Sequence, residues 1–126
     1  MATKKTFDVF GEEFTIQRTT SLFKKALVAE RGMEEIRKDF NEMLEDDTEY
    51  DGTAILDVEL KIFESRIKFL SELLGISAKK FEDFDPKEVS DFYEAVYYWL
   101  STREDQYEAG QQEPGKALES MKRFEK

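Results

Sequence analysis

Residues 54–75 read AILDVELKIFESRIKFLSELLG, and this stretch decides the fold of the chain. It has no Pro and only a final Gly, and its apolar residues recur with the spacing of an α-helix. One apolar stripe of the expected helix consists of Leu56, Leu60, Phe63, Ile67, Leu70 and Leu74. A second stripe, turned by roughly 120° at about 100° per residue, consists of Ile55, Val58, Ile62, Phe69 and Leu73.

Two apolar stripes predict a helix that is covered on both sides. A surface helix of a globular domain needs only one stripe, a little wider than about 100°. We expect the first stripe to lie in the core of the same chain. The second stripe is covered either by an N-terminal hairpin and the first helix, or by another subunit or a partner helix.

Residues 6–18, TFDVFGEEFTIQR, predict a β-hairpin with a Gly-Glu turn, in which Gly11 supplies the positive φ. Its alternating apolar residues are Phe7, Val9, Phe14 and Ile16. An isolated two-stranded hairpin is marginal in water, so we expect it to lie on the helices.

Two helical segments connect the hairpin to residues 54–75. The segment 22–32, LFKKALVAERG, follows the N-cap candidates Thr19, Thr20 and Ser21, and it ends at Gly32 unless the next segment continues it through a bend there. That next segment, 33–47, has one apolar stripe made of Met33, Ile36, Phe40, Met43 and Leu44. The rest of its surface is acidic.

A final aromatic helix is predicted for 86–104. Asp85 precedes Pro86, and Glu88 completes a capping box. The expected core face of this helix consists of Val89, Phe92, Tyr93, Val96, Trp99 and Leu100. Tyr97 flanks that face, while Tyr98 lies opposite it and is either an isolated exposed aromatic or an interface anchor.

The chain is therefore expected to be mainly α, with an N-terminal β-hairpin followed by a bundle of three to four helices. Residues 1–104 form one domain in this interpretation. Residues 105–126 form a flexible polar tail, because Gly110, Pro114 and Gly115 interrupt the pattern. The segment 116–126 could form a short helix with Leu118, Met121 and Phe124 apolar.

Composition restricts the function. The 126 residues carry a formal net charge of −10 and contain neither Cys nor His. This excludes disulfides and thiol chemistry, removes the usual general base, and disfavours nucleic acid and anionic membranes as partners. Seven charged residues within 54–75 argue against a membrane span, and MATKKTFDVF lacks the apolar region of a secretory signal. A cytoplasmic protein is expected.

Acidic residues give the one candidate for enzyme chemistry. All-α nucleotide pyrophosphohydrolases bind Mg²⁺ through paired carboxylates one helical turn apart, and this chain has Glu42-x-x-Glu45 and Glu88-x-x-Asp91. A whole helix separates the two pairs, and no Lys/Arg cluster for a triphosphate lies nearby. A solvated acidic face is the preferred interpretation, so we expect no catalytic residues, metal or cofactor. An acidic decoy for a basic, DNA-binding protein is a further alternative.

The layout resembles the tail assembly chaperones of long-tailed bacteriophages and prophages over residues 6–104. The resemblance is carried by the hairpin residues Phe7, Val9, Gly11, Phe14 and Ile16, together with the acidic helical body, the aromatic helix and the polar tail. It implies a non-enzymatic, self-associating helical protein that coats the tape measure protein and helps to recruit the major tail protein.

An apolar groove suits an amphipathic helical client, and surface charge keeps the complex in solution. The candidate interaction surface predicted from the sequence consists of Ile55, Val58, Ile62, Phe69, Leu73, Tyr97 and Tyr98.

Overall fold

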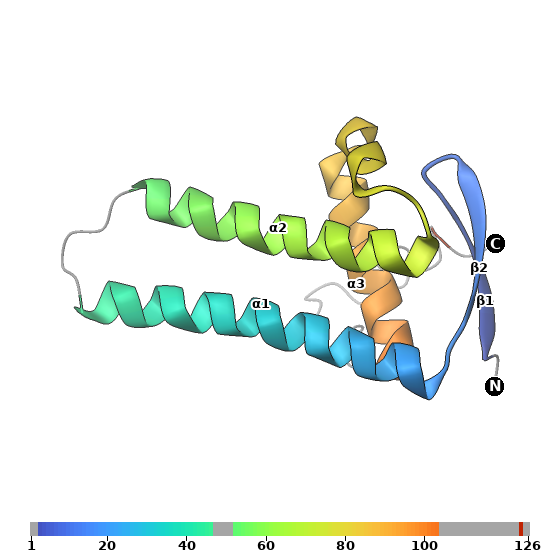
Figure 1. The fold of residues 1–126 in the computed structure, drawn as a ribbon, viewed down its shortest axis with the longest axis horizontal. Coiled ribbons are helices and arrows are strands. Elements are labelled where there is room, and N and C mark those ends of the chain that lie inside the picture. The colour runs from blue at the N-terminus through green and yellow to red at the C-terminus, as the bar shows by residue number, and fades with distance from the viewer. Residues whose placement is uncertain (1–2, 47–51, 104–123, 125–126) are drawn as a thin grey trace, which may run out of the picture.

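A computed structural model describes residues 3–46, 52–103 and 124. Its elements are β1 (Lys4–Val9), β2 (Glu12–Gln17), α1 (Thr20–Asp46), α2 (Gly52–Leu74), a 3₁₀ helix η1 (Ala78–Asp83) and α3 (Pro86–Leu100). The predicted mainly α fold with an N-terminal β-hairpin is confirmed. Figure 1 shows α1 and α2 side by side, with α3 crossing behind them near the end where the hairpin lies.

The turn of the β-hairpin lies one residue earlier than the sequence predicts. Val9 pairs with Glu12, which leaves Phe10 and Gly11 as the two turn residues. Both have positive φ, 57° and 77°, as a type I′ turn requires. A bulky residue rarely adopts this conformation. The Phe10 ring compensates by stacking on Phe84, with ring centroids 4.3 Å apart.

The hairpin packs on α3 rather than on the second stripe of α2. The Phe7 ring makes edge contacts with Phe92 and Trp99, at centroid distances of 5.4 and 5.6 Å. The Arg18 guanidinium lies over the Trp99 ring and donates a hydrogen bond to the Trp99 carbonyl oxygen at 3.0 Å. The hairpin therefore covers the aromatic helix, which leaves α1 to pack against α2.

Helix α1 continues through Gly32 as a single helix of 27 residues. It begins after Thr19, whose hydroxyl oxygen accepts a hydrogen bond from the Leu22 N–H at 3.2 Å. The prediction of an end at Gly32 is therefore wrong, and the alternative of a continuous helix is confirmed. A glycine weakens a helix without terminating it, so the propensity of the flanking residues prevails.

Replacing Gly32 by Ala is expected to raise the free energy of unfolding by about 0.5–1 kcal/mol, because Ala favours helix over Gly by that amount. A Cβ atom at residue 32 would meet no atom within 4 Å. Urea denaturation followed by circular dichroism, at low protein concentration, measures the change. The matched variant Gly11→Ala is expected to destabilise, because Gly11 has a φ of +77°. A loss of stability in Gly32→Ala would contradict the open environment of this residue.

Local signals fix the ends of the later helices. Gly75, at a φ of 72°, ends α2, and the N–H groups of Gly75 and Ile76 both donate to the Ser71 carbonyl oxygen. Asp85 occupies the N-cap of α3 with an extended backbone, and Pro86 begins the helix. The Asp85 side chain accepts no capping hydrogen bond, so that half of the predicted capping box does not form.

The core lies where α3 crosses the α1–α2 pair. All six residues predicted for the core face of α3 are buried, as are Ala26, Met33 and Leu70. No residue within 34–45 or 52–68 is buried. Leu56 and Leu60, which the sequence assigned to the core, are 63% and 55% exposed. This part of the core prediction is wrong, because no described element covers this face of α2 so far from its C-terminal end.

Most of the predicted tail, 105–126, lies outside the described residues, and so does its expected short helix. Phe124 is the exception. It is 1% exposed, and its ring lies 5.3 Å from that of Phe92. One apolar residue of the polar C-terminal segment thus contributes to the aromatic core. No helix in the described part of the chain is long and apolar enough to cross a membrane.

Candidate functional site

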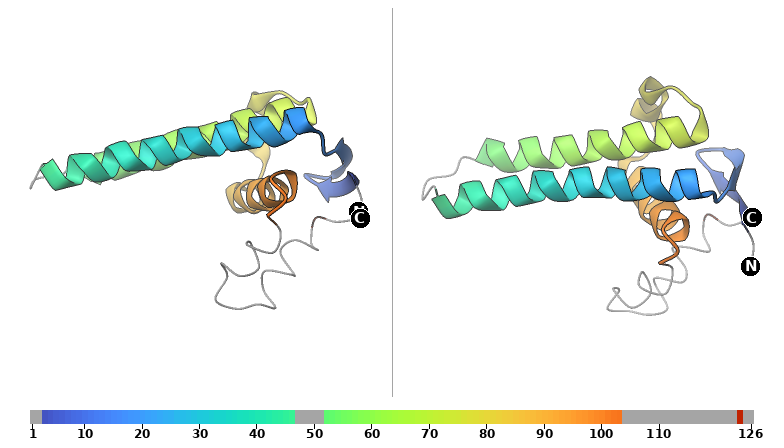
Figure 2. Two further views of the ribbon diagram at one scale, coloured as in Figure 1. Left: turned by 90° about the horizontal axis from the view of Figure 1, so that it is seen from below. Right: turned by 60° about the horizontal axis from the view of Figure 1, so that its bottom comes forward.

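The halves of α1 and α2 that extend beyond α3 form an arm, defined here as residues 34–46 and 52–64. Figure 2 shows this two-helix arm projecting away from α3 and the hairpin in both views. Its exposed large apolar residues are Met43, Leu56 and Leu60. Scattered apolar residues on a surface are normal, but Leu56 and Leu60 lie one helical turn apart, and Leu60 lines a groove.

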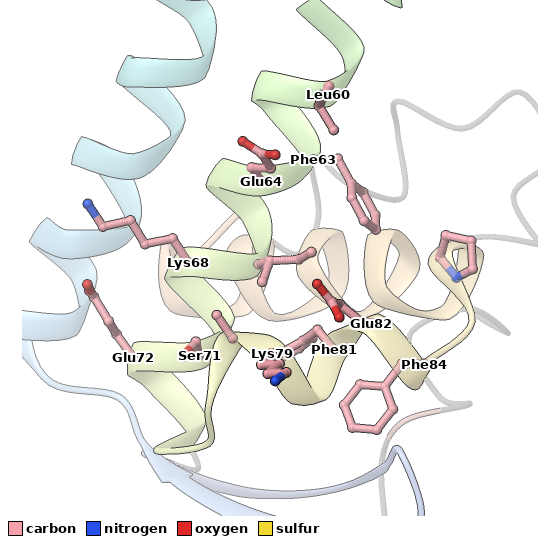
Figure 3. A pocket seen from close by; sticks show the side chains of 13 residues that line it. Leu60, Phe63, Glu64, Lys68, Ser71, Glu72, Lys79, Phe81, Glu82 and Phe84 are labelled. Atoms are coloured by element: carbon pink, nitrogen blue, oxygen red, sulfur yellow. The ribbon is translucent and has the colours of Figure 1, made fainter. Parts of the chain in front are cut away.

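This groove, which we call the α2–η1 groove, has a volume of about 730 Å³. Its apolar lining consists of Leu60, Phe63, Ile67, Ala78, Phe81, Phe84 and Pro86. Figure 3 shows Leu60 and Phe63 projecting from α2, with Glu82 and Phe84 on the opposite wall. The groove exists because η1 turns back beside α2 after Gly75, while Ser77 holds the start of η1 by accepting a hydrogen bond from the Lys79 N–H.

Charged side chains line the edge of the α2–η1 groove. They are Glu64, Lys68, Glu72, Lys79 and Glu82. An apolar floor with a charged edge is the arrangement that binds the apolar face of an amphipathic helix. Leu56 extends the exposed apolar surface by one helical turn beyond the groove, along the first stripe of α2.

The structure divides the seven residues of the predicted interaction surface. Phe69 and Tyr97 are buried, at 8% and 7% exposure, so they belong to the core. Ile62, Leu73 and Tyr98 are partly buried against that core. Ile55 and Val58 are half-buried, and Val58 lines a hollow between α1 and α2. Most of the second stripe is thus covered within the protomer, and the large apolar residues of α2 that stay exposed, Leu56 and Leu60, belong to the first stripe. Periodicity showed two stripes, but it could not show which of them α1 covers.

A polar network joins α1, α2 and α3. The Tyr93 hydroxyl donates a hydrogen bond to Glu30 Oε2 at 2.6 Å, and Glu30 also pairs with Arg37. The Arg66 guanidinium lies 5.1 Å from the Tyr93 ring centroid and 3.9 Å from Glu94 Oε1. Tyr93, Glu30, Arg66 and Glu94 each have a partner on another helix, whereas Arg37 pairs with Glu30 within α1. These contacts between helices favour a structural role for the network.

Burial raises the pKa of three side chains in and beside this network. Burial, and then the hydrogen bond to the Glu30 carboxylate, raise the pKa of Tyr93 far above its ordinary value. Burial also raises the pKa of Tyr97 and that of Glu94, while Arg66 opposes the shift at Glu94. The environment therefore keeps both tyrosine hydroxyls protonated.

We expect Tyr93 and Tyr97 to ionise at a higher pH than an exposed tyrosine. The folded state then binds more protons than the unfolded state above about pH 10, so stability falls as pH rises past that value. Ultraviolet absorbance of tyrosinate during an alkaline titration measures the order of ionisation. Tyr93→Phe should remove the latest step. Titration of all tyrosines together near the ordinary pKa would contradict the burial of these hydroxyls.

The two acidic pairs considered for Mg²⁺ lie on different elements. Glu42 and Glu45 lie on the arm, near the end of α1, whereas Glu88 and Asp91 lie in the first turns of α3. Among the described residues, no group of three or more His, Cys, Asp or Glu side chains comes together as metal ligands would.

Comparisons with protein families, with curated proteins and with solved structures give no match for this chain.

Proposed function

We propose that this protein is a non-enzymatic assembly chaperone that binds an amphipathic helical segment of a client along Leu56, Leu60 and the α2–η1 groove. The observation that carries the proposal is the apolar surface of α2, which remains more than half exposed at Leu56 and Leu60 and continues into the groove. A helix laid along this surface would bury both leucines.

The resemblance to tail assembly chaperones gives this activity a setting. The client would be the long, largely helical tape measure protein, and the complex would recruit the major tail protein in the cytoplasm of the host bacterium. The net charge of −10 supports this role, because it would keep a complex with an apolar client in solution. Self-association is part of the same proposal.

Binding of a helical tape measure fragment, measured by isothermal titration calorimetry, tests the proposed function. Leu60→Glu is expected to weaken binding at least about tenfold, because it places a carboxylate in the apolar contact. Val28→Glu is the matched control, since Val28 is exposed to a similar extent, 56%, but lies on α1 away from the α2–η1 groove. Undiminished binding by Leu60→Glu would reject this surface, and a wild-type chain that ignores the fragment would reject the function.

A further inference from the structure

A second surface lies on the face of the α1–α2 pair that is turned away from α3. It contains two hollows, one of about 490 Å³ beside the core and one of about 270 Å³ on the arm. Only residues of α1 and α2 line them, and Ile36 borders both, so together they form one front groove. Figure 1 shows α3 on the far side of the helix pair, and the left view of Figure 2 shows it displaced to one side of that pair.

The apolar residues of the front groove come from both helices. They are Val28, Ala29, Ile36, Phe40, Met43, Ala54, Val58 and Phe69. Val28 and Met43 are 56% and 39% exposed, so this face retains apolar surface at both of its ends. The front groove follows the junction of α1 with α2, and it adjoins the α2–η1 groove along Lys68 and Glu72, which line both.

Charge changes sign along the front groove. At the end beside the core its lining includes Lys24, Lys25 and Lys68 against the single acid Glu72, a balance of 3 − 1 = +2. At the arm end the lining includes Asp39 and Asp57 against the single base Lys61, a balance of 1 − 2 = −1. A locally positive end is unexpected on a chain whose net charge is −10. The two ends of the groove are therefore complementary to each other.

Gly32 lines the basic hollow one helical turn before Ile36, the residue that the two hollows share. It is exposed, and nothing lies within 4 Å of a Cβ atom built on it. Glycine is the least favourable helix residue after proline, yet nothing within the described protomer requires a glycine here. Because Gly32 has no side chain, a helix from another molecule could approach the α1 backbone closely at this point of the front groove.

We propose that the front groove binds the front groove of a second copy of this chain, with the helix pairs antiparallel and Gly32 near the two-fold axis. The basic end of each copy then faces the acidic end of the other, and both contacts are made twice. A parallel arrangement would instead place the lysines of the two copies opposite each other. Leu60 and the apolar lining of the α2–η1 groove take no part in this contact. The inference rests on the proposed self-association and gives it a surface and a symmetry.

Sedimentation equilibrium of the full chain over a concentration series, at low and high salt, tests the dimer. The wild type is expected to reach twice the mass of one chain at low salt and to dissociate as salt rises, since exposed charges are screened. A chain that stays monomeric throughout the series would overturn the proposal.

Charge reversal tests the pairing itself. The variant Lys24→Glu/Lys25→Glu has two acidic ends, and the variant Asp39→Lys/Asp57→Lys has two basic ends. Each is expected to lose self-association, and an equimolar mixture of the two is expected to regain the dimer mass. Persistence of either homodimer, or a mixture that stays monomeric, would overturn the antiparallel arrangement.

Gly32→Gln provides a test that does not depend on charge. Glutamine favours helix, so the monomer is expected to keep or gain helical signal while the dimer is lost. Circular dichroism confirms folding, and retention of the dimer would contradict the position of the axis. Leu60→Glu is expected to dimerise as the wild type does, whereas Gly32→Gln is expected to bind the helical fragment. The two variants therefore distinguish a failure of the proposed dimer from a failure of the proposed client site.

Discussion

Replacing Phe92 by Ala is expected to lower the free energy of unfolding by about 3–5 kcal/mol. Single domains are stable by only about 5–15 kcal/mol, so this loss is a large part of the total. Urea denaturation, followed by circular dichroism and by the fluorescence of Trp99, measures the change. The variant should unfold at a much lower urea concentration than the wild type.

The large effect follows from the burial of Phe92 and from its contacts with three other aromatic rings. It is 0% exposed, and its ring makes edge contacts with three rings from separate parts of the chain: Phe7 on β1 at 5.4 Å, Phe10 in the turn at 5.8 Å, and Phe124 near the C-terminus at 5.3 Å. Truncation to Ala removes all three contacts at once, in addition to the burial of the ring itself. The hairpin and the C-terminal residue should therefore loosen together.

Leu56→Ala is the matched control, because Leu56 is a large apolar residue that is 63% exposed. Its effect on unfolding is expected to stay within about 0.5 kcal/mol. A Phe92→Ala variant that loses less than about 1 kcal/mol would show that the aromatic contacts are not the basis of the core.

The sequence predicted those elements whose signals are local. Alternation identified the two strands, and the three- and four-residue spacing identified the helices. The start of α3 was recognised because Pro86 follows Asp85, and both the N-cap position and the first helical turn depend only on neighbouring residues. These elements do not require knowledge of what packs against them.

The predictions that were wrong depend on two things that local patterns do not show. One is the balance of helix propensity between neighbouring residues, and the other is contact between residues far apart in the sequence. Gly32 opposes the helix, but the residues on either side outweigh it, and no single-residue rule gives that balance. Phe10 adopts a positive φ because its ring packs on Phe84, a residue far along the chain. Phe124 reaches the core from a segment whose composition indicates a linker.

The candidate binding surface was only partly predictable for the same reason. The sequence showed that α2 has more apolar surface than one neighbour can cover. The identity of the exposed stripe depends on where α1 and α3 lie, and α3 crosses the pair at one end instead of running along it (Figure 1). Leu56 and Leu60 lie beyond that crossing and stay exposed, whereas Phe69, whose ring lies 5.8 Å from that of Tyr93 on α3, is buried.

Replacing Arg66 by Ala is expected to lower the free energy of unfolding by about 2 kcal/mol at neutral pH. The Arg66 side chain is 18% exposed, and its guanidinium lies 5.1 Å from the centroid of the Tyr93 ring, so truncation removes both packing and a cation–π contact. It also leaves Glu94 without the cation that lies 3.9 Å away. Urea denaturation at several pH values measures both contributions.

The loss is expected to depend on pH. Burial raises the pKa of Glu94, and Arg66 opposes that rise, so the variant should have a still higher Glu94 pKa. A raised pKa means that the folded state holds the proton over a pH range in which the unfolded state has released it. Stability then falls as pH rises through that range. The deficit of Arg66→Ala should therefore be smallest in acid, where Glu94 is protonated in both states, and should grow towards neutral pH.

The double variant Arg66→Ala/Glu94→Gln separates the two contributions. Removing the carboxylate should abolish the pH-dependent part of the loss and leave the packing part unchanged. Because the Glu94 side chain is 41% exposed, water screens its charge, and the recovered part should not exceed about 1 kcal/mol. If the double variant kept the full pH dependence of Arg66→Ala, the ionisation of Glu94 would not be its cause, and another group in contact with Arg66 would have to be responsible.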